Sequence, residues 1–269
     1  MKRKKIKLLA GAMIIAMTGA VFTGCGNNST SNDGTVTITV SGSTSVGPLM
    51  EKIAEKYEEE NSNISIEINQ TGSSAGIKDA MDGISQIGMS SRDLKDEEAA
   101  KVKATVLAYD GVAVITNTGN SVKELTIGQI RDIFTGKITN WSEVGGSNAP
   151  IVVVSREAGS GTRTAFEEGV EYSEEELVKD AIISKGNGDV KTTVSTNENA
   201  IGFVSFEYVD DAISSINVNG IEPTAANVKA GSYALSRPFL AVTNEQYITE
   251  DSQKLIDYIT SEEGQQIVE

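Results

Sequence analysis

Three short loops rich in glycine, serine and threonine constrain the fold of this chain more than any other feature. They span residues 41–45, 71–74 and 155–163, and each leads into a segment with the apolar spacing of a helix. Backbone N–H groups at a helix start lack intrahelical partners, and the macrodipole makes that end positive, so such loops suit oxyanions. The sequence therefore indicates an anion receptor built from strand–loop–helix units.

The first half of the chain repeats this unit. Strands are expected at 35–40, 64–68 and 84–89, with helices at 48–60 and 74–81 between them. Strand, loop, helix, strand predicts a sheet with parallel strands. In such sheets ligands bind beyond the carboxyl ends of the strands, which is where the loops fall.

The second half predicts another lobe. Residues 106–116 read as an extended crossover, 151–154 as a buried strand that feeds the third loop, and 239–242 as a returning strand before a closing helix at 252–268. We therefore predict an α/β protein in which each lobe is a mixed, mainly parallel sheet flanked by helices. Two crossovers would join lobe I, residues 35–110 and 237–269, to lobe II, residues 111–236.

The N-terminal segment is typical of an export signal. A basic start is followed by an apolar run from Leu8 to Phe22 and by small residues before Cys25, the only cysteine. We predict a lipoprotein signal peptide over residues 1–24, a lipid anchor on Cys25 and a flexible tether over 25–34. The protein is expected on the extracellular face of a bacterial cell membrane, and the signal favours a Gram-positive cell.

Charge and composition exclude several classes of function. The chain has 23 basic and 38 acidic residues, and removal of residues 1–24, which hold five of the basic ones, takes its net charge from −15 to −20. Such a surface repels nucleic acid, and an anion site must work through local hydrogen bonds. There is no histidine, which excludes Ser-His-Asp catalysis and the commonest zinc ligand. We expect no cofactor and no metal.

Several motifs together resemble a known family. They are Ser-Gly-Ser-Thr-Ser at 41–45, Thr-Gly-Ser-Ser-Ala-Gly-Ile at 71–77, Phe-Thr-Gly-Lys-Ile-Thr-Asn-Trp at 134–141, Ser-Arg-Glu-Ala-Gly-Ser-Gly-Thr-Arg at 155–163 and Asn-Ala-Ile-Gly-Phe at 199–203. In this order they resemble the phosphate-binding lipoproteins that serve as solute-binding components of high-affinity phosphate ABC transporters.

The resemblance implies a two-lobed type II periplasmic-binding-protein-like fold that closes on one inorganic phosphate. It further implies a monomer that delivers phosphate to the permease and ATPase subunits of a transporter. The family's ligand contacts carry over to Thr44, Ser45, Ser73, Arg156, Ser160, Gly161 and Thr162.

Two positions depart from the family pattern. Ser91 stands where some members have a carboxylate, and Ala158 stands where some have an acid two residues after the arginine. A buried carboxylate that accepts the proton of hydrogenphosphate would reject sulfate, because an unmet buried polar group is costly. We expect Ser91 to line the site and Asp110, at the crossover, to accept that proton, with Asp93 as the second candidate.

Two other readings stay open at this point. A receptor for another tetrahedral oxyanion, such as sulfate, molybdate or tungstate, would use the same loops. A phosphoryl-transfer or hydrolase enzyme is the remoter alternative, because the chain lacks both the Gly-x-x-x-x-Gly-Lys-Ser/Thr spacing and the Gly-x-Ser-x-Gly motif.

Overall fold

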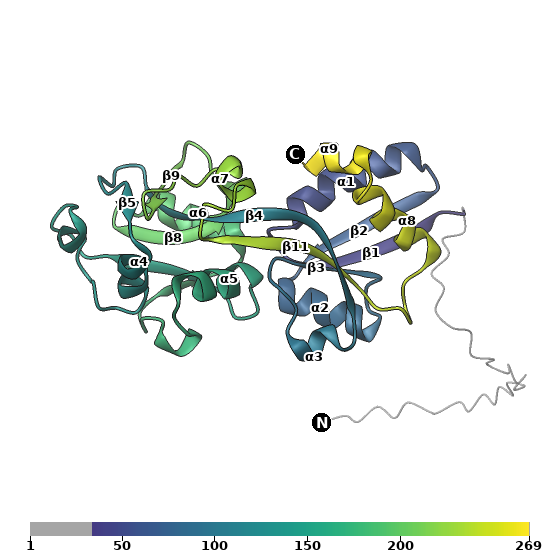
Figure 1. Ribbon diagram of the computed structural model, residues 1–269, viewed down its shortest axis with the longest axis horizontal. Helices are drawn as coiled ribbons and strands as arrows, with labels where there is room; N and C mark the ends of the chain where they lie inside the picture. The colour runs from purple at the N-terminus through teal and green to yellow at the C-terminus, as the bar shows by residue number, and fades with distance from the viewer. Residues whose placement is uncertain (1–33, 269) are drawn as a thin grey trace, which may run out of the picture.

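Two long strands join the two lobes of the molecule (Figure 1). The computed structural model describes residues 34–268. β4 (Lys103–Asn117) and β11 (Ser236–Thr243) run from one lobe into the other, and they connect the strands of both into one nine-stranded sheet. The order along this sheet is β2-β1-β3-β11-β4-β8-β6-β7, and β9 also pairs with β4.

Lobe I combines the first third of the chain with its last segment. Its helix α1 shows why these residues form a helix: Pro48 lies in the first turn, and Met50, Ile53 and Tyr57 line one buried face. The elements of this lobe are β1 (Val36–Gly42), α1 (Gly47–Glu60), β2 (Ile64–Gln70), α2 (Ser73–Asp82), β3 (Ile87–Ser90), α3 (Asp96–Ala99), α8 (Glu250–Ile259) and α9 (Glu262–Val268).

Lobe II contains the middle of the chain. Its helix α4 begins with a capping box, in which Thr126 and Gln129 satisfy each other's backbone N–H groups. The elements of this lobe are β5 (Glu124–Leu125), α4 (Ile127–Phe134), η1 (Trp141–Val144), β6 (Val152–Arg156), α5 (Gly161–Val170), η2 (Glu174–Glu176), β7 (Ile182–Ser184), α6 (Gly186–Thr196), β8 (Ala200–Ser205), η3 (Phe206–Tyr208), β9 (Ile213–Ser215), β10 (Asn217–Val218) and α7 (Ala225–Lys229).

The fold class is confirmed, with fewer parallel pairs than expected. β1 lies parallel to β2 and β3, and β6 lies parallel to β7 and β8. The crossover strands β4 and β11 instead run antiparallel to each other and to their neighbours β8 and β3. A chain that leaves one lobe and later returns crosses the hinge in opposite directions, so its two crossovers pair antiparallel.

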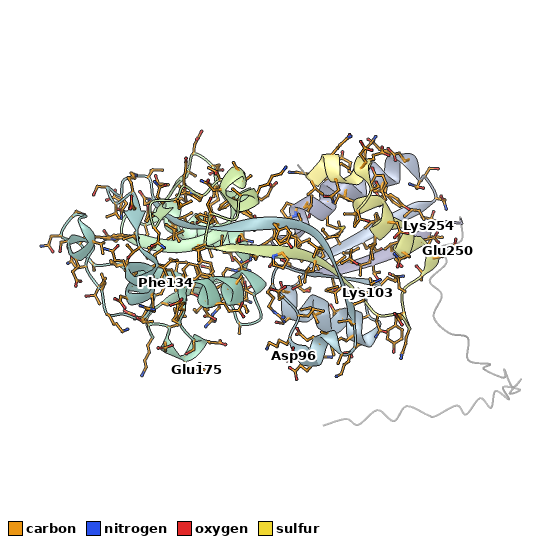
Figure 2. The ribbon with its side chains drawn as sticks, viewed as in Figure 1. Asp96, Lys103, Phe134, Glu175, Glu250 and Lys254 are labelled. Carbon is orange, nitrogen blue, oxygen red and sulfur yellow. The ribbon has the colours of Figure 1, made fainter. Side chains whose placement is uncertain are left out.

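Each lobe has its own hydrophobic core. The lobe I core gathers β1, α1 and α8 and takes Leu107 from β4 and Phe239 from β11. The larger lobe II core is aromatic, and Phe134 lies among its side chains (Figure 2). It begins at Val112, five residues after Leu107 on the same strand. The crossover strands therefore change cores between Leu107 and Val112, and Asp110 lies in that interval.

The expected elements differ from the structure in two places. The third strand begins at Ile87 rather than residue 84, because Gly83 ends α2 in the left-handed conformation and Ile84 follows it in a turn. The closing helix is two helices, α8 and α9, that meet at Thr260 and Ser261. Ser261 accepts the N–H of Gly264 on its hydroxyl, which starts a new helix instead of extending the first.

The predicted limits of the two lobes stay a prediction, although the separate cores agree with them. The signal peptide, Cys25 and most of the tether lie outside the described residues. Within residues 34–268, every helix is too short or too polar to span a membrane.

Candidate functional site

The glycine- and serine-rich loops of lobe I meet at one edge of its sheet. The parallel strands β1, β2 and β3 end at Gly42, Gln70 and Ser90, and the loops that follow them lie side by side. The carbonyl of Gly42 accepts hydrogen bonds from the N–H groups of Thr71 and Gly72. Parallel pairing thus brings segments far apart in the sequence to one wall of the interlobe cleft.

Three buried serine hydroxyls form this lobe I wall. Ser43 Oγ accepts the backbone N–H groups of Ser45 and Val46, so its own proton is donated to Ser91 Oγ at 2.9 Å. Ser73 Oγ accepts the N–H of Ser91 at 3.1 Å and lies 3.3 Å from Ser91 Oγ. None of these three side chains carries a charge. The hydroxyls of Ser73 and Ser91 can each still donate one hydrogen bond and accept another.

The lobe II wall is charged. Arg156, at the end of β6, is 1% exposed, and its guanidinium donates through Nε and Nη2 to Glu157 at 2.8 Å each and through Nη2 to Thr44 Oγ1 at 3.2 Å. Its Nη1 is buried without a hydrogen-bond partner in residues 34–268. A buried cationic donor left unpaired is costly, so an anion in the cleft would satisfy it.

Burial of the Glu157 carboxyl group and its pairing with Arg156 shift the pKa of Glu157 in opposite directions. Partial burial opposes its ionisation, but hydrogen bonds and charge from Arg156, together with backbone donors, outweigh burial and lower the pKa of Glu157. The carboxylate therefore stays charged and fixes the plane of the Arg156 guanidinium. Glu157 thus provides the salt-bridge partner for Arg156 that Ala158, the residue after it, cannot provide.

Helix α5 starts at Gly161, five residues after Arg156. Ser160 is its N-cap and accepts the N–H of Arg163 at 3.2 Å. The N–H groups of Gly161 and Thr162 belong to the first turn, where backbone donors have no intrahelical acceptor. Ser160, Gly161 and Thr162 thus bring the positive end of a helix to the cleft, as the third loop predicted.

Gly161 leaves no room for a side chain between the two walls. A Cβ at this position would lie 2.3 Å from Ser73 Oγ and 2.8 Å from Ser91 Oγ, both in the opposite lobe. Only glycine fits between the serine hydroxyls and the helix start in this closed arrangement.

Direct hydrogen bonds hold the lobes together across the cleft. Ser45 Oγ and Thr162 Oγ1 lie 2.8 Å apart, and the N–H of Ser74 donates to the carbonyl of Gly159 at 3.1 Å. Tyr208 donates its hydroxyl proton to the carbonyl of Thr44 at 2.9 Å. The structure is therefore the closed form of a two-lobed protein.

Asp110 lies at the base of the cleft, opposite Arg237 on the neighbouring crossover strand. Its Oδ2 accepts from Arg237 Nη2 at 2.9 Å and from Ser205 Oγ at 2.9 Å. Burial raises the pKa of Asp110, while Arg237, Ser205 and the backbone of Phe206 oppose that rise. The other carboxylate considered, Asp93, is exposed and lies outside this cluster.

The sequence analysis missed two residues of the cluster. Asn187 Nδ2 donates to Ser45 Oγ at 3.0 Å and to Thr44 Oγ1 at 3.2 Å. It follows Gly186 at the start of α6, so a fourth glycine-containing loop after a strand could have revealed it. Arg237 lies in the returning crossover, where no sequence pattern marks it as part of a site.

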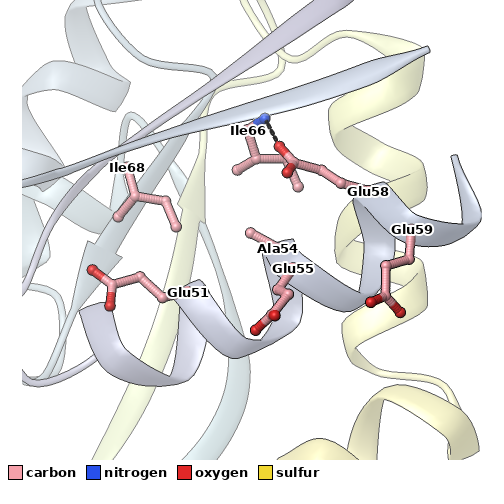
Figure 3. A pocket seen from close by; sticks show the side chains of 7 residues that line it. All are labelled: Glu51, Ala54, Glu55, Glu58, Glu59, Ile66 and Ile68. Carbon is pink, nitrogen blue, oxygen red and sulfur yellow. Dashed lines mark hydrogen bonds between the residues drawn. The ribbon is translucent and has the colours of Figure 1, made fainter. Parts of the chain in front are cut away.

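An acidic groove in lobe I does not suit an anion. It lies between α1 and the edge strand β2, and Glu58 there accepts the N–H of Ile66 (Figure 3). The groove is lined by Glu51, Ala54, Glu55, Glu58, Glu59, Ile66 and Ile68. Its carboxylates repel phosphate or sulfate, so the interlobe cluster is the candidate anion site.

Comparisons with known proteins also indicate an anion-binding protein. A family model described as the PBP superfamily domain matches residues 27–263. The phosphate-binding protein PstS of Borreliella burgdorferi is 30% identical over 268 residues, which cover 96% of this chain and 95% of that protein. The phosphate-binding protein PstS of Bacillus subtilis is 30% identical over 284 residues, which cover all of this chain and 92% of that protein.

Solved structures extend the similarity to the whole two-lobed fold. A phosphate ABC transporter substrate-binding protein with bound phosphate from Clostridium perfringens has a TM-score of 0.85 and 58% identity, covering 86% of this chain and 96% of that one. An ABC-type phosphate transport receptor from Vibrio cholerae has a TM-score of 0.73 and 36% identity, with the same coverage.

Proposed function

Because this chain belongs to the PBP superfamily and, within it, to the family of phosphate-binding proteins named PstS, we propose that it captures inorganic phosphate between its lobes. It then delivers the phosphate to the membrane permease and ATPase subunits of an ABC transporter. The family is the substrate-binding part of a transporter and not an enzyme.

The observation that carries this proposal is the buried, unpartnered Nη1 of Arg156. Arg156 is held against Thr44 of the first loop, and the start of α5 faces the serine hydroxyls of the other lobe, so positive charge, helix N–H groups and hydroxyls all lie along the boundary between the lobes. We assign phosphate binding to Thr44, Ser45, Ser73, Ser91, Arg156, Ser160, Gly161 and Thr162, with Asp110 at the base of the site.

Closure around a dehydrated anion explains why both lobes are needed. Lobe II supplies the charge, and lobe I supplies hydroxyls that adapt to oxygens with or without a proton. Neither wall surrounds a tetrahedral anion alone, so binding and hinge closure are one event.

The place of action is outside the cytoplasm, as for a substrate-binding protein of this family. We further propose that Cys25 carries the lipid anchor, that the cell is Gram-positive and that the protein acts as a monomer. The support is the basic and apolar N-terminal segment that ends in small residues before the only cysteine.

Titration calorimetry tests the proposal. The chain from residue 35 onward, which contains every described strand and helix, is stripped of bound anion by partial unfolding and titrated with phosphate and sulfate in parallel. Tight binding of phosphate with no response to sulfate supports the function. Equal binding of both anions would indicate a general oxyanion receptor, and binding of neither would refute the proposal.

A further inference from the structure

A closed ring of polar contacts crosses the hinge beneath the anion site. Arg237 Nη2 donates to Ser45 Oγ at 3.0 Å and to Asp110 at 2.9 Å, and Asp110 accepts from Ser205 Oγ. The backbone N–H of Ser205 donates to Asn187 Oδ1 at 3.1 Å, and Asn187 Nδ2 donates to Ser45 Oγ at 3.0 Å, which closes the ring. The ring joins a lobe I loop, both crossover strands and two elements of lobe II.

The ring fixes the direction of the Ser45 hydroxyl. A hydroxyl oxygen has two acceptor lone pairs and one proton. In Ser45 the N–H donors of Arg237 and Asn187 use both lone pairs. Its proton is left to be donated, and Thr162 Oγ1 lies 2.8 Å away to accept it. Thr162 then directs its own proton elsewhere and keeps one lone pair, so Ser45 and Thr162 form a donor chain whose last proton, on Thr162, is the one available to an anion.

Asp110 is occupied within the same ring. Its Oδ2 accepts from Arg237 Nε at 3.2 Å, Arg237 Nη2 and Ser205 Oγ, and the backbone of Phe206 also stabilises the carboxylate. An ionised carboxylate has about four lone-pair sites. Oδ2 has no capacity left to accept the proton of hydrogenphosphate, and the backbone of Phe206 shares the remaining lone pairs of the carboxylate, whereas Ser73 and Ser91 keep capacity to accept.

We infer that Arg237 and Asn187 are positioning residues of the phosphate site, which fix Ser45 as a hydrogen-bond donor, and that Asp110 acts on the anion through Arg237. This inference rests on the proposed phosphate binding. Arg237 also donates through Nη1 to the carbonyl of Ser91 at 3.4 Å, so a single side chain anchors two loops of the lobe I wall.

The test uses calorimetry with phosphate and with sulfate on the chain from residue 35 onward. Arg237→Met is expected to weaken phosphate binding about tenfold to a hundredfold, since the Ser45 proton loses its fixed direction. Arg237→Lys, which keeps a charged donor, should recover part of that loss. In a Ser45→Ala background Arg237→Met should have a clearly smaller effect than in wild type, because the larger part of its effect passes through Ser45.

A matched control separates positioning from general destabilisation. Arg92 is also buried and pairs with Glu98 at 2.8 Å, and its guanidinium donates further to Ser74 and Asp93 but to none of the assigned phosphate ligands. Arg92→Met should lower the melting temperature and leave the phosphate Kd within about threefold. If Arg237→Met does not fold, Arg237→Met/Asp110→Asn removes both buried charges and leaves neither unpaired.

Three outcomes would overturn the inference while wild type still binds phosphate. Arg237→Met could bind as well as wild type, or its effect could add fully to that of Ser45→Ala. Asp110→Asn could change the phosphate-to-sulfate ratio about tenfold in the Arg237→Met background, which would make Asp110 itself the proton acceptor. Failure of wild type to bind phosphate would instead refute the proposed function.

Discussion

The two walls of the cleft differ in the groups that they present to an anion. The lobe I wall is made of neutral hydroxyls that bond mainly to one another and to backbone N–H groups. The lobe II wall holds a buried arginine, its carboxylate partner and the start of a helix. Charge provides affinity for an oxyanion, and hydroxyls provide the contacts that sense its protonation state.

This division suits a strongly acidic protein. A net charge of −15 for the whole chain repels anions at long range, so attraction has to be local and shielded from solvent. Arg156 suits this need because Glu157 and Thr44 fix two sides of its guanidinium, while Nη1 has no hydrogen-bond partner within residues 34–268.

Removal of the charge from the lobe II wall should have the largest effect. Arg156→Met is expected to weaken phosphate binding about a hundredfold or more, because a charge-assisted hydrogen bond in a desolvated site is lost. Calorimetry measures the change. Arg131→Met, a half-exposed arginine of the same lobe that pairs with Glu171, is the control and should bind normally. Equal affinity of the Arg156 variant and wild type would remove Arg156 from the site.

A side chain added between the two walls should have the next largest effect on phosphate affinity. In Gly161→Ala the new methyl group would meet Ser73 Oγ at 2.3 Å, so full closure requires the opposite wall to move. We expect phosphate binding to weaken about tenfold, the range for an overpacked contact. Gly188→Ala, where an added Cβ meets nothing within 4 Å, is the matched control. Comparable losses in both variants would mean that the contact across the cleft is unimportant.

A carboxylate added to the neutral lobe I wall should change the selectivity of the site between phosphate and sulfate. Ser91→Asp places a strong acceptor beside Ser73, where an anion's protonated oxygen could donate to it. The phosphate-to-sulfate affinity ratio should rise about tenfold, because sulfate would face an unpaired negative charge. Ser91→Asn, which adds similar volume without charge, should leave the ratio near that of wild type. A fall in the ratio for Ser91→Asp would show that Ser91 does not face the ligand's proton.

Low pH should destabilise each lobe through one arginine–glutamate pair, and we expect this effect to be the smallest of those predicted. Hydrogen bonds from Arg92 lower the pKa of Glu98 in lobe I, and Arg156 outweighs burial to lower the pKa of Glu157 in lobe II, both from 4.5. A lowered folded-state pKa gives stability that is present above the unfolded value and lost as pH falls through the folded one.

The free energy of unfolding should therefore decrease as pH falls below about 4.5, and less steeply in Glu98→Gln or Glu157→Gln. Denaturant titrations at several pH values measure the slope. Only Glu157→Gln should also weaken phosphate binding at neutral pH. A slope unchanged in both variants would contradict the assignment of these pairs.

Local patterns predicted the loops of both walls better than the base of the cleft. The loops at 41–45, 71–74 and 155–163 combine strand ends, glycines and helix starts, and their positions follow from βαβ topology. Arg237 could not be found in this way. Its place depends on the pairing of two crossover strands whose register sets it opposite Asp110, more than a hundred residues earlier.

The same limit applies to Asp110, whose expected role as proton acceptor stays a prediction. The sequence places this residue near the hinge but does not show the donors that occupy it, which come from β8 and β11. Ser91, which stands where some family members have a carboxylate, is in contact with Ser43 and Ser73. Long-range pairing, rather than residue type, decides which polar group remains free to meet a ligand.

The most direct test of the two-walled site is to locate the anion. Crystals grown with arsenate, a tetrahedral analogue of phosphate, would show its arsenic by anomalous scattering. The account predicts one peak between the lobes, with oxygens within hydrogen-bond distance of Arg156 Nη1 and of a hydroxyl from Ser73 or Ser91. A peak that contacts one lobe only, or that lies outside the cleft, would contradict it.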